Sequence, residues 1–237
     1  SVEGLETAYG QSQVLFGVSL RIVFAVVLVS VQSGLFMGAR AKIAVVIDQI
    51  KDADLWVVPI GTKSFDDPSL LSGREKYAIL STPGVKSVEE ILVSFASWRK
   101  PQGGQKAFIL VGLDWANGGL KPWNLDEGSV DDLMTPNSLA VDRFYFKDLG
   151  IDGRGSRAEV NGQGVQIAAV THGIRSFTTM PYAFTSLDRA RAITGAGAEQ
   201  STYQIVKISP GANLEQVPRH VLAGTLERLS RTAHLLG

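Results

Sequence analysis

The residues of this chain that could carry out acid–base or nucleophilic chemistry are few and scattered. None of the three histidines, His172, His220 and His234, has a second metal ligand at helical spacing. His172 is followed by Ser176 and Asp188, the residue types of a serine hydrolase, but such a trio meets only in tertiary structure. A histidine in a loop is the simpler interpretation. The sequence therefore predicts no catalytic residue and no metal site.

Two acidic pairs and a group of glycines have similarly simple explanations. Acidic loops and helix N-termini account for Asp126-Glu127 and Asp131-Asp132 without a catalytic role. The glycines between Gly150 and Gly164 surround an expected hairpin, which favours turn geometry over a nucleotide site. The chain contains neither a GxxxxGK[ST] phosphate loop nor a GxSxG nucleophile elbow. We expect no bound cofactor.

The segment Thr171–Arg191 is unusual because aromatic residues alternate with threonine and serine. Its candidate partner-binding residues are Arg175, Phe177, Met180 and Tyr182. Aromatic residues, methionine and arginine are enriched where proteins meet, which favours a docking surface. In the alternative interpretation, the same side chains cover the core beneath a loop.

The composition excludes several classes of function. The 23 basic and 23 acidic residues give no net charge, so nothing indicates a nucleic-acid partner. Cysteine is absent, which excludes disulfides, thiolate nucleophiles and cysteine-ligated metals.

An uncharged stretch, Ile22–Ala39, dominates the N-terminal part of the chain. From Val14 the mainly apolar span would make about 39 Å of helix, against about 30 Å of bilayer hydrocarbon. A membrane helix and stalk over 14–51, after a flexible lead-in over 1–13, is therefore the leading prediction. A cleaved signal peptide and a wholly buried helix are the alternatives.

The rest of the chain mixes strand and helix patterns and predicts an α+β fold. The runs LWVVPI, Glu90–Arg99, Lys106–Gly112 and TYQIVKI predict strands, and Asn161-Gly162 predicts a hairpin turn. Helices are expected over 72–80, 142–149, 185–193 and 214–229. This order begins as a split βαβ layer.

Four segments carry a resemblance to a known family. They are Asp52–Asp66, Ile91–Asp114, NLDEGS at 124–129 and Gly173–Arg191. Together they resemble the periplasmic part of ABC exporter permeases of the DevC and MacB type, within the FtsX-like permease superfamily. The resemblance covers roughly Val14–Leu229. Those permeases have four membrane helices and this chain has one candidate, so we expect a fragment.

The resemblance implies a function without chemistry of its own. A separate ATP-binding subunit would drive motion from the cytoplasmic side of the bacterial inner membrane. The first helix would carry that motion to a periplasmic domain, which docks an adaptor (membrane fusion) protein that leads to an outer-membrane duct. The full-length permease would pair as a homodimer, with the bulk of this chain in the periplasm.

The resemblance also implies a two-lobed domain. We expect a split βαβ (ferredoxin-like) lobe from 52–113 plus 200–230 and an inserted mixed α/β lobe over 114–199. Two other functions remain open: an anchored or secreted α+β domain that acts as an enzyme or ligand binder, and an FtsX-like regulator of a cell-wall hydrolase.

Overall fold

The computed structural model describes residues 5–9, 12–18, 22–34, 53–60, 62, 65–115, 119–174, 176, 180–210 and 226–230. The chain divides into two compact units, Ser1–Val45 and Val46–Gly237.

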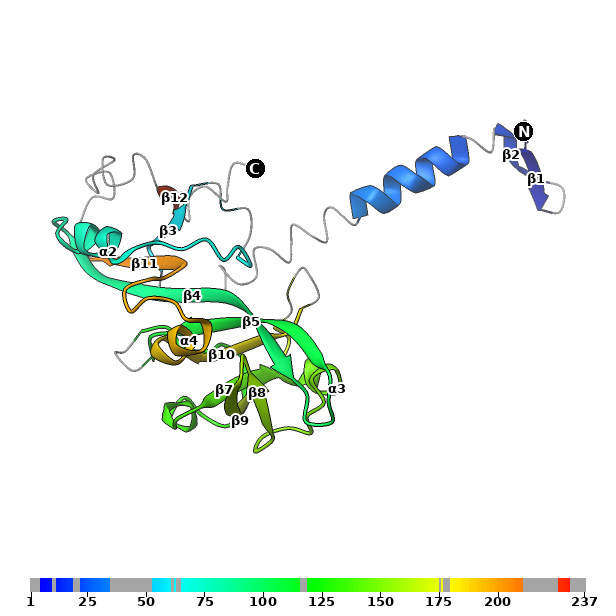
Figure 1. Cartoon of the computed structure of the whole chain (residues 1–237). Helices are drawn as coiled ribbons and strands as arrows, with labels where there is room; N and C mark the ends of the chain where they lie inside the picture. The colour runs from blue at the N-terminus through cyan, green and yellow to red at the C-terminus, as the bar shows by residue number, and fades with distance from the viewer. Residues whose placement is uncertain are drawn as a thin grey trace. The chain divides into compact units, whose positions relative to one another are not determined.

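The first unit contains a hairpin and a helix (Figure 1). Strands β1 (Leu5–Tyr9) and β2 (Ser12–Val18) pair in antiparallel fashion, and a helix covers 22–34. The predictions of a structureless lead-in over 1–13 and of a helix beginning at Val14 are therefore wrong. Backbone pairing with β1 satisfies the polar groups of β2, and Val14, Phe16 and Val18 are residue types that favour strands.

The remainder of the predicted membrane helix and stalk, 35–51, lies outside the described residues. Among the helices that are described, none is long and apolar enough to cross a membrane.

The first lobe of the second unit has the predicted split βαβ layer. Strand β3 (Leu55–Pro59), helix α2 (Gly73–Leu80) and strand β4 (Val85–Arg99) follow one another along the chain. Strand β11 (Tyr203–Ile208) lies between β3 and β4 and is antiparallel to both, so β3 and β4 are parallel. The order β12-β3-β11-β4 is that of a ferredoxin-like sheet, which confirms the α+β class.

The last strand of this lobe corrects one prediction. Residues Leu226–Ser230 form β12, antiparallel to β3, although a helix was expected to reach Leu229. The start of that predicted helix, 214–225, lies outside the described residues. Its apolar positions suit either structure at this length, and the open edge of β3 supplies a partner for the backbone.

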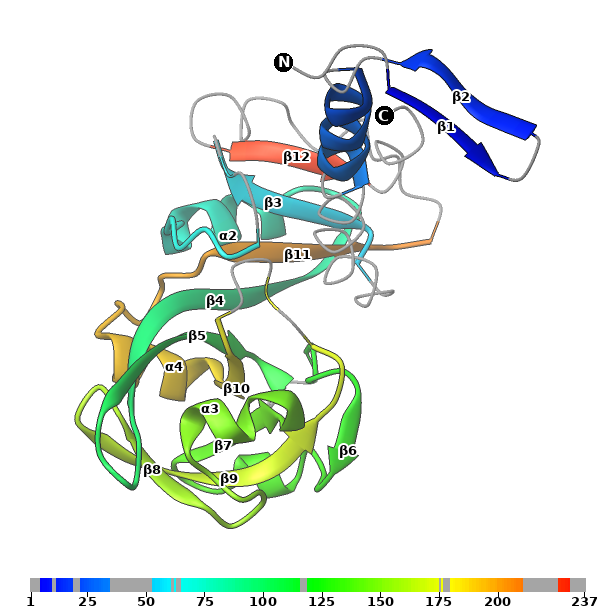
Figure 2. The same ribbon diagram turned by 90° about the vertical axis from the view of Figure 1, so that its right-hand side faces the viewer.

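The second lobe is a closed barrel, which the sequence did not indicate. Its strands are β5 (Gln105–Leu113), β10 (Tyr182–Ser186), β7 (Ser138–Asp142), β9 (Gln163–Thr171), β8 (Arg157–Val160) and the end of β4. Each strand pairs with the next in that order, and β8 returns to β4 through Trp98 and Arg99. Figure 2 shows this ring of strands. Closure leaves no exposed edge within the ring.

Short elements complete the second lobe. They are β6 (Leu125–Glu127), the 3₁₀ turns η2 (Asp132–Met134) and η3 (Arg143–Tyr145), and helices α3 (Phe146–Leu149) and α4 (Leu187–Thr194). Large apolar side chains fill the barrel: Trp98 and Phe108 meet edge to face with ring centroids 5.7 Å apart. The Trp98 indole N–H also donates to the Leu149 carbonyl at 3.0 Å, which fixes α3 on the barrel.

The Asn161-Gly162 turn joins β8 to β9 as predicted. Both residues have positive φ angles, 47° and 80°, as a two-residue hairpin of this kind requires. The Asn161 side chain also accepts a hydrogen bond from the Ser97 N–H at 2.8 Å and donates to the Ile193 carbonyl at 3.2 Å. The turn therefore also connects β4 and α4.

Candidate functional site: the seam between the lobes

Strand β4 belongs to both lobes of the second unit. Its first half, from Val85 to Ile91, pairs with β11, and its second half, from Ile91 to Arg99, pairs with β5. The barrel therefore begins near Ile91 and not at the expected boundary of 114. A strand shared in this way couples the two lobes through continuous backbone hydrogen bonding.

One apolar cluster spans the seam. Trp56 and Ile205 come from the first lobe, and Val111 and Phe184 come from the barrel, all within the same buried group. Helix α4 packs in a separate apolar cluster, and Gly112 permits its close approach to β5 because a Cβ there would meet Leu187 and Ala190. A continuous core makes independent motion of the lobes costly.

A buried carboxylate connects a helix of each lobe to β4. Glu90 is 5% exposed, and its carboxylate lies 2.6 Å from Nζ of Lys76 on α2 and 3.2 Å from Nη2 of Arg191 on α4. Arg191 also donates from Nε and Nη2 to the Gln200 carbonyl at 3.0 and 2.9 Å. These contacts fix both helices relative to the shared strand.

A second polar network anchors the segment around Asp66. The hydroxyls of Ser176 and Tyr182 both donate to the Asp66 carboxylate, the former at 2.7 Å. Burial, reinforced by the hydrogen bond with Asp66, raises the pKa of Tyr182. Asp66 lies in the connection between β3 and α2, so the network joins the first lobe to β10 of the barrel.

Tyr203 adds a further contact at the same place. Its hydroxyl donates to the Phe65 carbonyl at 3.0 Å, and its ring stacks on Phe65 with centroids 5.3 Å apart. Burial raises the pKa of Tyr203 as well. Both phenols therefore stay protonated well above neutral pH and act as hydrogen-bond donors.

The four predicted partner-binding residues have different environments. Arg175 and Phe177 lie outside the described residues. Met180 is partly buried and packs against the apolar cluster of the seam, and Tyr182 is 3% exposed. The ring of Tyr182 is thus buried in the core, as the alternative interpretation expected.

The residues considered for catalysis have other contacts. Ser176 donates to Asp66, and the Asp188 carboxylate is 98% exposed and lies 3.8 Å from Arg191. His172 is exposed and its backbone N–H donates to the Asn124 carbonyl at 3.1 Å. Ser176 and Asp188 therefore each contact a residue outside the trio that was considered and not favoured.

Three of the four residues in the two acidic pairs form ion pairs at the surface. Asp126 and Glu127 both contact the Arg143 guanidinium, the latter at 3.2 Å. Asp132 accepts from Ser129 and lies 2.6 Å from Arg154, and the Ser129 hydrogen bonds chiefly lower its pKa. Within the described ranges, no three histidine, aspartate or glutamate side chains are grouped as metal ligands.

Sequence reasoning missed Glu90, Arg191 and Asp66, the charged residues that hold the seam. Glu89 and Glu90 lie directly before the apolar run Ile91–Val93, and a charged residue beside such a run was the available signal for a buried ion pair. No local pattern indicated the partners of Glu90, because Lys76 and Arg191 lie 14 and 101 positions away in the chain.

Comparison with solved structures identifies similar folds. No protein-family model matches the chain, and no curated protein matches it by sequence. Its structure is similar to the periplasmic region of MacB from Actinobacillus actinomycetemcomitans, with a TM-score of 0.53 and 13% identity over 80% of this chain and 95% of that one.

A second solved structure is similar over a comparable range. It is the extracellular domain of the noncanonic ABC-type transporter YknZ from Gram-positive bacteria, with a TM-score of 0.51, 13% identity, and coverage of 75% of this chain and 99% of that one. The second unit thus has a fold like that of the MacB periplasmic region, as the resemblance of the four sequence segments implied.

Proposed function

We propose that this chain is part of the permease subunit of an ABC export system in the bacterial inner membrane, with its second unit outside the membrane. The observation that carries the proposal is the fold, since domains of this architecture occur in MacB and in the transporter YknZ. In this proposal ATP is bound by a separate ATPase subunit, and the chain itself binds no cofactor and catalyses no reaction.

The exposed apolar helix supports attachment to a membrane. Over 22–34 it carries no charged residue, and large apolar side chains such as Phe24 and Val26 are exposed. Exposed apolar surface is unfavourable in water and suited to lipid. The uncharged sequence continues to Ala39.

The seam supports a role in transmitting motion. The shared strand β4, the continuous apolar cluster and the Glu90 ion pairs join the lobes into one body. When one end of a rigid domain is displaced, the whole domain moves with it, because its parts do not rearrange relative to one another. We propose that ATP-driven motion of the membrane helices reaches an adaptor (membrane fusion) protein in this way, with an outer-membrane duct beyond it and two permease copies in the assembly.

For the adaptor contact we propose the segment that contains Arg175, Phe177 and Met180. Tyr182 is excluded from the contact because its ring is buried. This segment leads directly into β10, so a partner bound there is connected to the barrel wall.

Co-purification tests the proposal. The full-length protein, extracted from bacterial membranes, should bring down an ATP-binding subunit and a periplasmic adaptor, identified by mass spectrometry. Phe177→Ala should reduce recovery of the adaptor several-fold and leave recovery of the ATPase unchanged. Phe144→Ala, which removes an exposed phenylalanine of the barrel lobe, is the matched control.

Two results would contradict the proposal. Purification without any ATP-binding subunit would overturn the permease assignment. Recovery of a cell-wall hydrolase in place of an adaptor would support the FtsX-like alternative. Equal adaptor recovery from the Phe177→Ala variant and the wild type would remove the docking segment alone.

A further inference from the structure

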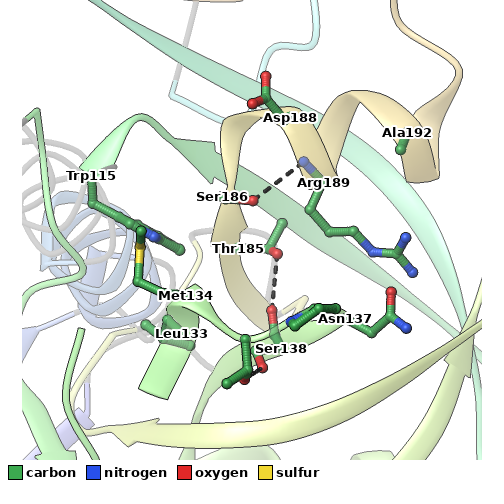
Figure 3. Close-up of a pocket in the computed structure, with 12 residues that line it drawn as sticks. Trp115, Leu133, Met134, Asn137, Ser138, Thr185, Ser186, Asp188, Arg189 and Ala192 are labelled. Carbon is green, nitrogen blue, oxygen red and sulfur yellow. Dashed lines mark hydrogen bonds between the residues drawn. The ribbon is translucent and has the colours of Figure 1, made fainter. Parts of the chain in front are cut away.

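A pocket of about 410 Å³ lies beside the first turn of α4 (Figure 3). Trp115 and Met134 line one side of it, and the guanidinium of Arg189 extends toward Asn137 on the other side. Its volume lies within the range of small-molecule sites, roughly 300 to 1,000 Å³.

Two buried donors of this pocket have no partner. Trp115 is 4% exposed, yet its indole Nε1 forms no hydrogen bond within the described part of the chain. The Nε atom of Arg189 is also buried and unpaired, and its guanidinium forms no ion pair with any described residue. Buried polar groups of folded proteins are usually satisfied by protein, water or ligand, so two orphans in one pocket indicate a missing acceptor.

The hydroxyl groups of the pocket form hydrogen bonds with other groups, and none of them accepts from the Trp115 indole or from Nε of Arg189. Thr185 donates to the Ser138 carbonyl at 2.9 Å, and Ser186 accepts from the Arg189 backbone N–H at 3.3 Å. The indole N–H and the guanidinium can only donate, so the complementary ligand must supply acceptors. The positive guanidinium and the N-terminus of α4 both favour an anion.

Two further features restrict the class of ligand that fits the pocket. Leu133, Met134 and the Trp115 ring form an apolar wall, which suits a ligand with an apolar group. Asp188 lines the pocket and its carboxylate is exposed. Because this carboxylate is negatively charged, it repels a phosphate dianion more strongly than a monoanion. The planar guanidinium matches the two oxygens of a carboxylate.

We propose that this pocket binds a carboxylate attached to an apolar group, with Arg189 holding the carboxylate and the Trp115 indole N–H donating to a second acceptor. The C-terminus of a peptide and a free small carboxylate share this chemistry. The proposal does not depend on the chain being a permease.

Calorimetric titration of the full chain tests it with three probes: N-acetyl-leucine, its neutral amide N-acetyl-leucinamide, and inorganic phosphate. The acid should bind at least about tenfold more tightly than the amide, because only the acid pairs with the guanidinium. Equal binding of acid and amide, or tighter binding of phosphate, would overturn the proposal.

Substitutions locate the site. Arg189→Met keeps the apolar stem and should weaken N-acetyl-leucine binding about tenfold or more, while Trp115→Phe should weaken it less. Arg74→Met is the matched control, since Arg74 is an exposed arginine in the first turn of α2. Equal binding by the Arg189→Met and Arg74→Met proteins would overturn the assignment.

A fourth titration distinguishes the two sources of the ligand. An extended peptide acid, acetyl-Ala-Ala-Leu, that binds more tightly than N-acetyl-leucine would indicate a peptide terminus. Equal binding of the two acids would indicate a free small carboxylate. Failure of both acids to bind would overturn the proposal.

Discussion

The carboxylate of Glu90 lies 3.2 Å from Nη2 of Arg191, and this ion pair ties the strand shared by both lobes to helix α4 of the barrel lobe. The other oxygen of the same carboxylate lies 2.6 Å from Nζ of Lys76 on α2. One buried anion therefore holds a helix from each lobe. Because the lobes meet on β4, loss of this anion should lower the stability of the whole second unit.

Glu90→Gln should lower the free energy of unfolding by about 2–4 kcal/mol, because Lys76 loses its counter-ion and the largely buried Arg191 keeps only the exposed Asp188, 3.8 Å away. Urea unfolding of the full chain measures the loss. Glu159→Gln is the control, since Glu159 and Arg99 are exposed and 3.6 Å apart, and its cost should stay below about 1 kcal/mol. Equal losses for the two variants would contradict a structural role for the Glu90 pairs.

Gly112→Ala should destabilise the contact between β5 and α4. The added Cβ would lie 3.2 Å from the Cα of Leu187 and closer still to the Ala190 side chain, so α4 must shift. We expect a loss of about 1–3 kcal/mol in thermal or urea unfolding. Gly164→Ala, in β9, has open space around the new Cβ and should be neutral or slightly stabilising. A neutral Gly112→Ala would contradict the close packing of α4.

Thr202→Val should cost about 2–4 kcal/mol, since two buried backbone groups lose their partner. The Thr202 hydroxyl accepts from the Val93 N–H at 2.9 Å and donates to the Val93 carbonyl at 3.0 Å, just before β11 begins. Thr194→Val provides the same change at a partly exposed hydroxyl that donates to the Ala190 carbonyl at 2.8 Å. Urea unfolding measures both variants, and Thr194→Val should lose less free energy of unfolding than Thr202→Val.

Stability should decrease as the pH rises above about 10. Burial raises the pKa of Tyr182 and Tyr203 above the ordinary value of 10.0. The unfolded chain then releases these protons at a lower pH than the folded protein does, so stability is full below pH 10 and declines above it. Each tyrosine adds up to about 1.4 kcal/mol per pH unit to the slope.

Unfolding free energies between pH 9 and 11 measure this slope. The double variant Tyr182→Phe, Tyr203→Phe should be less stable at pH 8 but should lose most of the decline at high pH. Tyr77→Phe, which removes an exposed phenol, should keep the wild-type slope. An undiminished slope in the double variant would show that other groups cause the alkaline loss.

Local patterns anticipated much of the second unit. The apolar run LWVVPI became β3, the Asn161-Gly162 dipeptide became the β8–β9 turn, and the helix expected over 185–193 became α4 (Leu187–Thr194). The helix–strand order also indicated the split βαβ layer. In each case the deciding interactions lie within a few residues of one another, so the sequence is enough to recognise them.

Short apolar runs that suit a helix and a strand equally well were predicted less reliably. An apolar run that begins at Val14 fits a helix, but pairing with Leu5–Tyr9 makes Ser12–Val18 a strand. Leu226–Ser230 likewise fits a helix face, and the edge of β3 makes it β12. The partner strand, and not the run itself, determined the structure in both places.

By itself the sequence determined the α+β class, the split βαβ layer, and the resemblance that the comparison of folds supports. Only the tertiary structure decided that the inserted lobe closes into a barrel, that Tyr182 faces the core, and that Glu90, Arg191 and Lys76 meet at the seam. It also brought Trp115 and Arg189 to one pocket. The physical reason is that barrel closure, buried ion pairs and pockets depend on contacts between residues far apart in the chain, which no local pattern encodes.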